Sequence, residues 1–64
     1  MVMGHKVVNT IFAKDRNFEV VAFWDRKTPD DIEFWEVYTL RGALINPDPF
    51  RDHEPTAADI APYL

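Results

Sequence analysis

The chain contains no cysteine, and for a sequence of 64 residues this absence restricts the ways in which a fold can become stable. A chain this short buries only about 60% of the surface that its unfolded form exposes. Small domains therefore add disulfides, a metal, oligomerisation or an unusually rich core. Disulfides and thiolate metal sites are excluded here. Because 47% of the residues are hydrophobic and 14% are aromatic, we expect a rich core together with association between chains.

A β-hairpin is the clearest local pattern. Two runs rich in β-branched and aromatic residues, 6–13 and 18–25, flank a polar stretch at 14–17. This arrangement is typical of two antiparallel strands joined by a short turn. We predict a four-residue turn that pairs Ala13 with Phe18. That register places seven apolar residues among eight on one face, which a one-sided core requires.

Residues 29–41 allow two interpretations that lead to different folds. The sequence Thr28-Pro29-Asp30-Asp31 resembles a helix start, and Gly42 would suit a helix stop. However, most residues from 32 to 40 are β-branched or aromatic, which favours a strand. We therefore predict a third strand over 32–41, which could extend past Gly42 to 45. The alternative is a hairpin packed on a helix at 29–41.

The C-terminal segment 46–64 differs in composition from the rest of the chain. Two prolines flank an aspartate near the beginning of this segment. They terminate the regular structure that precedes them. Thr56 and Asp59 have the spacing of a helix capping box, so we predict a short helix near 56–61. A helix this short is unstable alone in water and must dock on the sheet. Its apolar anchors are Ile60, Tyr63 and Leu64.

These patterns together predict a small, β-rich α+β fold. Residues 1–64 form a single domain, because no repeat, low-complexity tract or long linker divides them. The architecture is a three-stranded antiparallel meander followed by one short C-terminal helix.

Sequence motifs of enzymes and metal sites are missing. The chain has no serine or cysteine nucleophile, and its two glycines cannot form a phosphate-binding loop. The histidines His5 and His53 stand far apart in sequence, and the polar neighbours of His53 point apart in an extended chain. Glu36 falls between apolar residues, where it needs an exposed rim or a polar partner, and we favour the rim. We expect no enzyme activity, catalytic residue, metal, cofactor or small-molecule substrate.

The charge is acidic and unevenly distributed. The net charge is −4, and residues 46–64 hold four acidic side chains against one basic side chain. This distribution argues against a general polyanion binder, because phosphate neutralisation needs clustered lysine and arginine. No signal-like start and no membrane-length apolar run occur. The absence of cysteine is compatible with a reducing compartment, so we expect a cytoplasmic protein with no membrane partner.

We predict a non-catalytic protein–protein interaction module that self-associates, as a homodimer, through an aromatic sheet face or edge. A three-stranded sheet with apolar residues on both faces cannot hide both faces beneath one short helix. The residues expected at the interaction surface are Phe23, Trp24, Trp35, Val37 and Tyr38.

Two alternatives belong to other functional classes. An acidic decoy or inhibitor of phage or plasmid type would occupy a basic site on its partner, with strong salt dependence. Its acidic segment would consist of Asp48, Asp52, Glu54 and Asp59. A weak single-stranded nucleic-acid binder would stack bases on Trp24 beside Arg26 and Lys27. Nucleic acid is the less favoured partner, because only two basic residues lie there in acidic surroundings.

Overall fold

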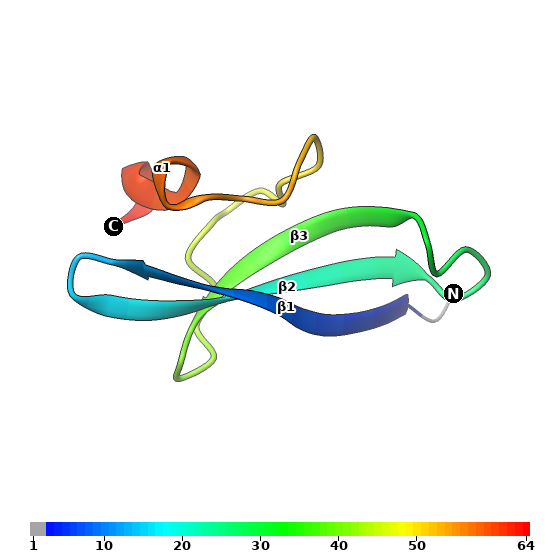
Figure 1. The fold of residues 1–64 in the computed structure, drawn as a ribbon, viewed down its shortest axis with the longest axis horizontal. Helices are drawn as coiled ribbons and strands as arrows, with labels where there is room; N and C mark the ends of the chain where they lie inside the picture. Colours follow the sequence, from blue (N-terminus) through cyan, green and yellow to red (C-terminus); the bar gives the residue numbers. More distant parts are fainter. Residues whose placement is uncertain (1–2) are drawn as a thin grey trace.

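Three strands form one antiparallel sheet in the order β1–β2–β3 in the computed structural model, which describes residues 3–64 (Figure 1). The elements are β1 (Met3–Ala13), β2 (Arg16–Asp25), β3 (Ile32–Thr39), α1 (Ala57–Ile60) and a 3-10 turn (Ala61–Tyr63). The predicted three-stranded meander with a short C-terminal helix is confirmed. The alternative helix at 29–41 is wrong, because most of that segment forms β3.

The turn between β1 and β2 is tighter than predicted. Its central residues, Lys14 and Asp15, have φ angles of 52° and 58°. Two such residues make a two-residue hairpin turn of type I′, whose twist matches that of the strands. Ala13 therefore pairs with Arg16, and the predicted pairing with Phe18 is wrong. From Asn9 to Ala13 the register differs from the prediction by two residues, so the side chains of this part still share the predicted face.

A β-bulge interrupts β1 at Val8. Asn9 pairs with Val20, whereas Val7 pairs with Val21, so Val8 is an extra residue without a partner of its own. An extra residue exchanges the two faces of the strand beyond it. Val7, which we expected on the same face as Asn9, lies on the opposite face instead.

The third strand ends earlier than predicted. β3 stops at Thr39, and the chain reverses near Gly42, whose φ of 89° is readily adopted only by glycine. The backbone N–H of Ile45 then donates a hydrogen bond of 3.0 Å to the carbonyl of Val37. The strand therefore does not extend past Gly42 to 45, and it ends two residues before the predicted 41. The chain runs back along the edge of β3 instead of extending it.

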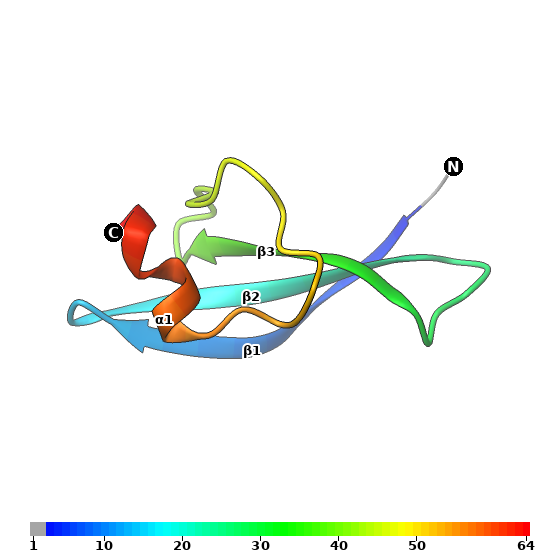
Figure 2. The same cartoon turned by 90° about the horizontal axis from the view of Figure 1, so that it is seen from above.

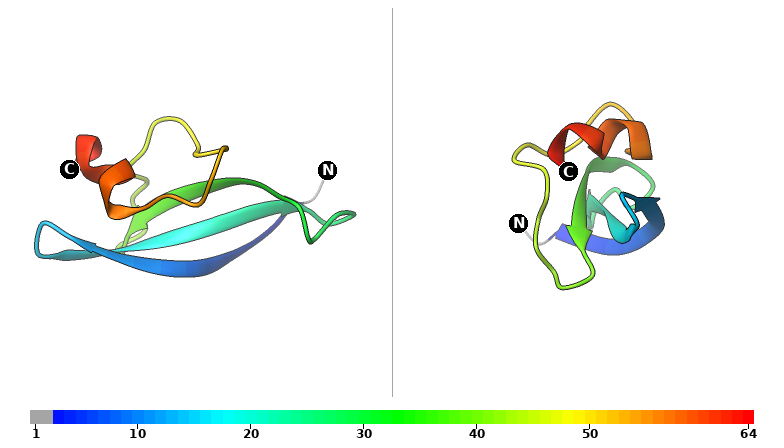
Figure 3. Two further views of the ribbon diagram at one scale, coloured as in Figure 1. Left: turned by 45° about the horizontal axis from the view of Figure 1, so that its top comes forward. Right: turned by 90° about the vertical axis from the view of Figure 1, so that its left-hand side faces the viewer.

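The C-terminal segment covers one face of the sheet, and α1 lies near the β1–β2 turn (Figures 2 and 3). We call this the covered face and the other the open face. Ile60 of this segment joins the buried sheet residues Ile11, Phe18, Val20 and Val37 in one core cluster. The predicted docking of the helix through Ile60 is confirmed, whereas Tyr63 and Leu64 remain exposed.

Candidate interaction surface

The five residues predicted to form an interaction surface are divided between the two faces of the sheet. Phe23 and Tyr38 belong to the open face, and Trp24, Trp35 and Val37 to the covered face. Val37 is fully buried, and Trp35 packs against the same core cluster. Side chains alternate between faces along a strand, so neighbours in sequence such as Phe23 and Trp24 point in opposite directions.

Trp24 packs against the backbone of β1. Its indole lies so close to Gly4 that a Cβ atom at that position would overlap the ring. The Trp24 indole can approach the β1 backbone this closely because Gly4 has no side chain. Arg26 and Lys27 are exposed in the turn after β2, but the indole beside them is half-buried against Gly4.

A row of planar groups crosses the open face. The rings of His5 and Phe23 lie 5.7 Å apart, and those of Phe23 and Phe34 lie 4.8 Å apart. The guanidinium of Arg51 lies 5.4 Å from the centre of the Phe34 ring, which ends the row with a cation–π contact. Sequence analysis did not connect these residues. Only the register of all three strands brings them into one row.

The polar residues of the open face are paired. The Tyr38 hydroxyl donates a hydrogen bond of 2.6 Å to Glu36 Oε1. This bond, with burial and the negative charge of Glu36, raises the pKa of Tyr38 to about 12. The expected exposed-rim position of Glu36 is wrong, because the side chain is half-buried and has Tyr38 as its partner. Glu19, which pairs with Tyr38, places a second carboxylate on this face.

The outer edge of β3 is filled by the returning chain. Trp35 and Phe50 exchange two backbone hydrogen bonds, of 2.8 and 2.9 Å. The N–H of Val37 donates to Oδ1 of Asn46 at 3.0 Å. Asn46 is itself buried, and its Nδ2 donates to a backbone carbonyl at 2.7 Å. Sequence analysis missed this role, because an asparagine before a proline looks like an ordinary turn residue.

The outer edge of β1 is open. Among residues 3–64, β1 pairs only with β2, so it remains an edge strand of 11 residues. Its exposed apolar side chains include Phe12 and Val7, which are 66% and 49% exposed. None of the eleven acidic residues lies in β1, and Lys6 is its one permanently charged side chain.

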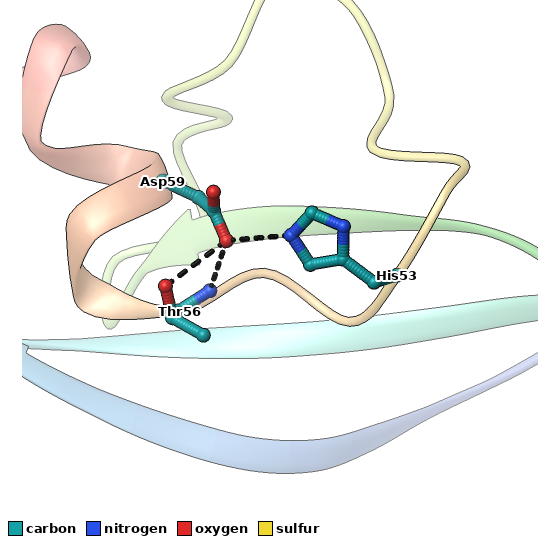
Figure 4. A network of polar contacts seen from close by, with 3 residues as sticks. All are labelled: His53, Thr56 and Asp59. Atoms are coloured by element: carbon teal, nitrogen blue, oxygen red, sulfur yellow. Dashed lines mark hydrogen bonds and ion pairs between the residues drawn. The ribbon is translucent and has the colours of Figure 1, made fainter.

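One residue of the predicted acidic segment has a structural role. Asp59 Oδ2 accepts hydrogen bonds from the backbone N–H of Thr56 at 2.8 Å and from the Thr56 hydroxyl at 3.0 Å (Figure 4). His53 Nε2 lies 2.9 Å from the same oxygen. The Thr56 backbone bond, followed by the side-chain bonds of His53 and Thr56, lowers the pKa of Asp59. This carboxylate helps to begin α1.

The other three acidic residues, Asp48, Asp52 and Glu54, are exposed. Glu54 Oε2 lies 3.4 Å from Nδ2 of Asn9, a long contact between the C-terminal segment and β1. Of the four acidic residues of this segment, Asp48 and Asp52 have carboxylates without a hydrogen bond or ion pair among the described residues.

Residues 3–64 contain no group of three or more histidine, cysteine or acidic side chains placed to hold a metal ion. Within the same residues, no helix has the length and apolar character needed to cross a membrane. Comparisons with protein-family models, curated proteins and solved structures find no match to this chain.

Proposed function

We propose that this chain is a non-catalytic interaction module that forms a symmetric homodimer by antiparallel pairing of the β1 strands of two copies. The observation that carries the proposal is the difference between the two sheet edges: the β3 edge is filled, and the β1 edge is open. An edge strand presents unpaired N–H and C=O groups, which form a template for another strand. Such strand addition is a common mode of protein recognition.

Pairing through the edge is favoured over stacking of the two open faces. Face-to-face packing would bring Glu19 and Glu36 of one copy against the same face of the other. Burial of charged carboxylates is costly unless each has a charged or hydrogen-bonding partner. Edge pairing buries neither carboxylate further. It also uses the outer side of β1, which pairs with no other strand among residues 3–64.

The charge distribution also favours β1. Two copies, each with a net charge of −4, repel one another. The strand β1 has no acidic residue and one lysine, so repulsion is smallest when the copies approach along this strand. A twofold axis then gives both copies the same contacts, as in most small homodimers.

The acidic segment is a weaker basis for function than the β1 edge. Asp59 is part of the cap of α1, and Glu54 contacts Asn9. Neutralising Asp59 to test a decoy function would therefore change the fold as well as the charge. The nucleic-acid alternative is also weaker, because the Trp24 indole lies against Gly4.

Light scattering over concentrations from about 10 μM to about 1 mM tests the proposal, since this range covers dissociation constants typical of weak dimers. We expect the mass to rise from 7.5 kDa toward twice that value. Val7→Lys places a charge at the β1 edge and should restore the monomer. The matched control is Leu44→Lys, because Leu44 is 46% exposed and lies along β3 instead.

Two outcomes would overturn the proposal. One is a mass that remains at 7.5 kDa over the whole range. The other is equal weakening of the dimer by Val7→Lys and Leu44→Lys, which would indicate that added charge, rather than its position, controls association.

NMR spectra locate the interface. Amide shifts that depend on protein concentration should be largest in residues 3–13.

A further inference from the structure

A pocket of about 300 Å³ lies at the end of the sheet where β2 begins and β3 ends. It lies between residues of the β1–β2 turn and of the chain reversal after β3. The lining residues are Asp15, Arg16, Asn17, Thr39, Leu40 and Arg41. The pairing of Phe18 with Thr39 brings these two short segments together.

The first arginine is held in place by the core. Arg16 follows the tight turn, and its guanidinium lies 5.3 Å from the centre of the Phe18 ring. Phe18 is fully buried, so the surface beneath the guanidinium is rigid. A cation–π contact of this kind limits the side-chain rotamers and reduces the entropy lost on binding.

The second arginine is held by a closed loop. The N–H of Thr39 donates to the carbonyl of Ala43 at 2.9 Å, and the N–H of Gly42 donates to the carbonyl of Thr39 at 2.9 Å. The N–H of Ala43 also donates to the Thr39 hydroxyl at 3.1 Å. Three hydrogen bonds therefore anchor the backbone on both sides of Arg41.

The pocket carries positive charge in an acidic protein. Two arginines and one aspartate line it, so the lining has a net charge of +1, whereas the whole chain has a net charge of −4. Among residues 3–64, neither arginine forms an ion pair with a carboxylate. A guanidinium has a planar set of donors that matches a carboxylate or a phosphate in two parallel hydrogen bonds.

We propose that this pocket binds the carboxylate or phosphate group of a small molecule, with Arg16 and Arg41 as its cationic ligands. The Asn17 amide supplies a further donor, and Leu40 supplies an apolar wall. A volume of about 300 Å³ is at the lower end of the range for ligand sites, which suits a compact anion. The negative charge of Asp15 repels an anionic ligand and lowers the affinity of the pocket for it. The proposal does not depend on association through β1.

Amide shifts in NMR spectra test the site when inorganic phosphate and citrate are added separately at constant ionic strength. We expect saturable shifts at residues 15–17 and 39–41. Tighter binding of phosphate would identify a phosphate site, and tighter binding of citrate a carboxylate site. Chloride at the same ionic strength serves as the reference for general screening.

Three variants separate a specific site from a general effect of charge. Arg41→Gln should weaken binding about tenfold, the loss expected for one charge-assisted hydrogen bond. Asp15→Asn should strengthen binding, and asparagine is readily accepted at a φ of 58°. Arg26→Gln changes the net charge by the same amount as Arg41→Gln at the opposite end of β2, and should leave binding unchanged.

The proposal is overturned if neither anion produces saturable shifts. It is also overturned if Arg41→Gln and Arg26→Gln weaken binding equally, or if Asp15→Asn leaves the affinity unchanged. Asp15→Asn is informative even if the loop around Arg41 does not tolerate substitution, because it lies in the other wall of the pocket.

Discussion

The two outer edges of this sheet differ in how they end. On β3, the N–H groups of Trp35, Val37 and Thr39 all find acceptors in the returning chain. On the outer side of β1, no strand pairs with it among residues 3–64. The chain that follows β3 covers one face of the sheet and fills one of its edges. Within the described residues, the sheet is thus completed at one edge and left open at the other.

Removing the main anchor of the C-terminal segment, which covers one side of the sheet, should have the largest effect on stability. Ile60 is fully buried, so Ile60→Ala should lower the free energy of unfolding by about 2–5 kcal/mol. A domain of this length has a total stability of about 3–10 kcal/mol, so much of the protein should unfold. Urea unfolding followed by tryptophan fluorescence measures the loss.

The control for this variant is Leu64→Ala. Leu64 is 39% exposed and should lose far less stability than Ile60. Equal effects at the two positions would mean that α1 does not cover the core.

Opening the filled edge should have the next largest effect. Asn46→Ala leaves the buried N–H of Val37 without its acceptor, at a cost of about 1–3 kcal/mol. The exposed Asn17 makes no side-chain hydrogen bond among residues 3–64, so Asn17→Ala should change stability by about 0.5 kcal/mol or less. Asn46→Ala should also form larger assemblies in light scattering, because both edges of the sheet then have unpaired groups. Equal stability in the two variants would contradict the role of Asn46.

The smallest expected effect is on the stability of the protein at acidic pH. The pKa of Asp59 is below its ordinary value of 3.8, so its contribution to stability is present above pH 3.8. That contribution is lost as the pH falls through the lower, folded-state pKa. In His53→Ala the pKa should move toward 3.8 but not reach it, because the Thr56 N–H still binds the carboxylate. The carboxyl carbon shift of Asp59 in an NMR pH titration measures the pKa, and an unchanged value would remove His53 from the cap.

Much of the fold could be predicted from short patterns. Alternation of apolar residues indicated the strands, and the spacing of Thr56 and Asp59 indicated the start of α1. The candidate surface could be predicted less well. Trp24 and Val37 were expected at an interface, but one packs on Gly4 and the other lies in the core. Aromatic content alone does not show which face the C-terminal segment covers.

The sequence by itself determined the three strands, the capped helix and the absence of recognisable catalytic motifs, because each depends on residues close together in the chain. Tertiary structure decided the tight turn at Lys14, the bulge at Val8 and the reversal at Gly42. It also decided that Asn46 completes one edge while β1 stays open. These features depend on strand twist and on hydrogen bonds between distant residues, which no local pattern records.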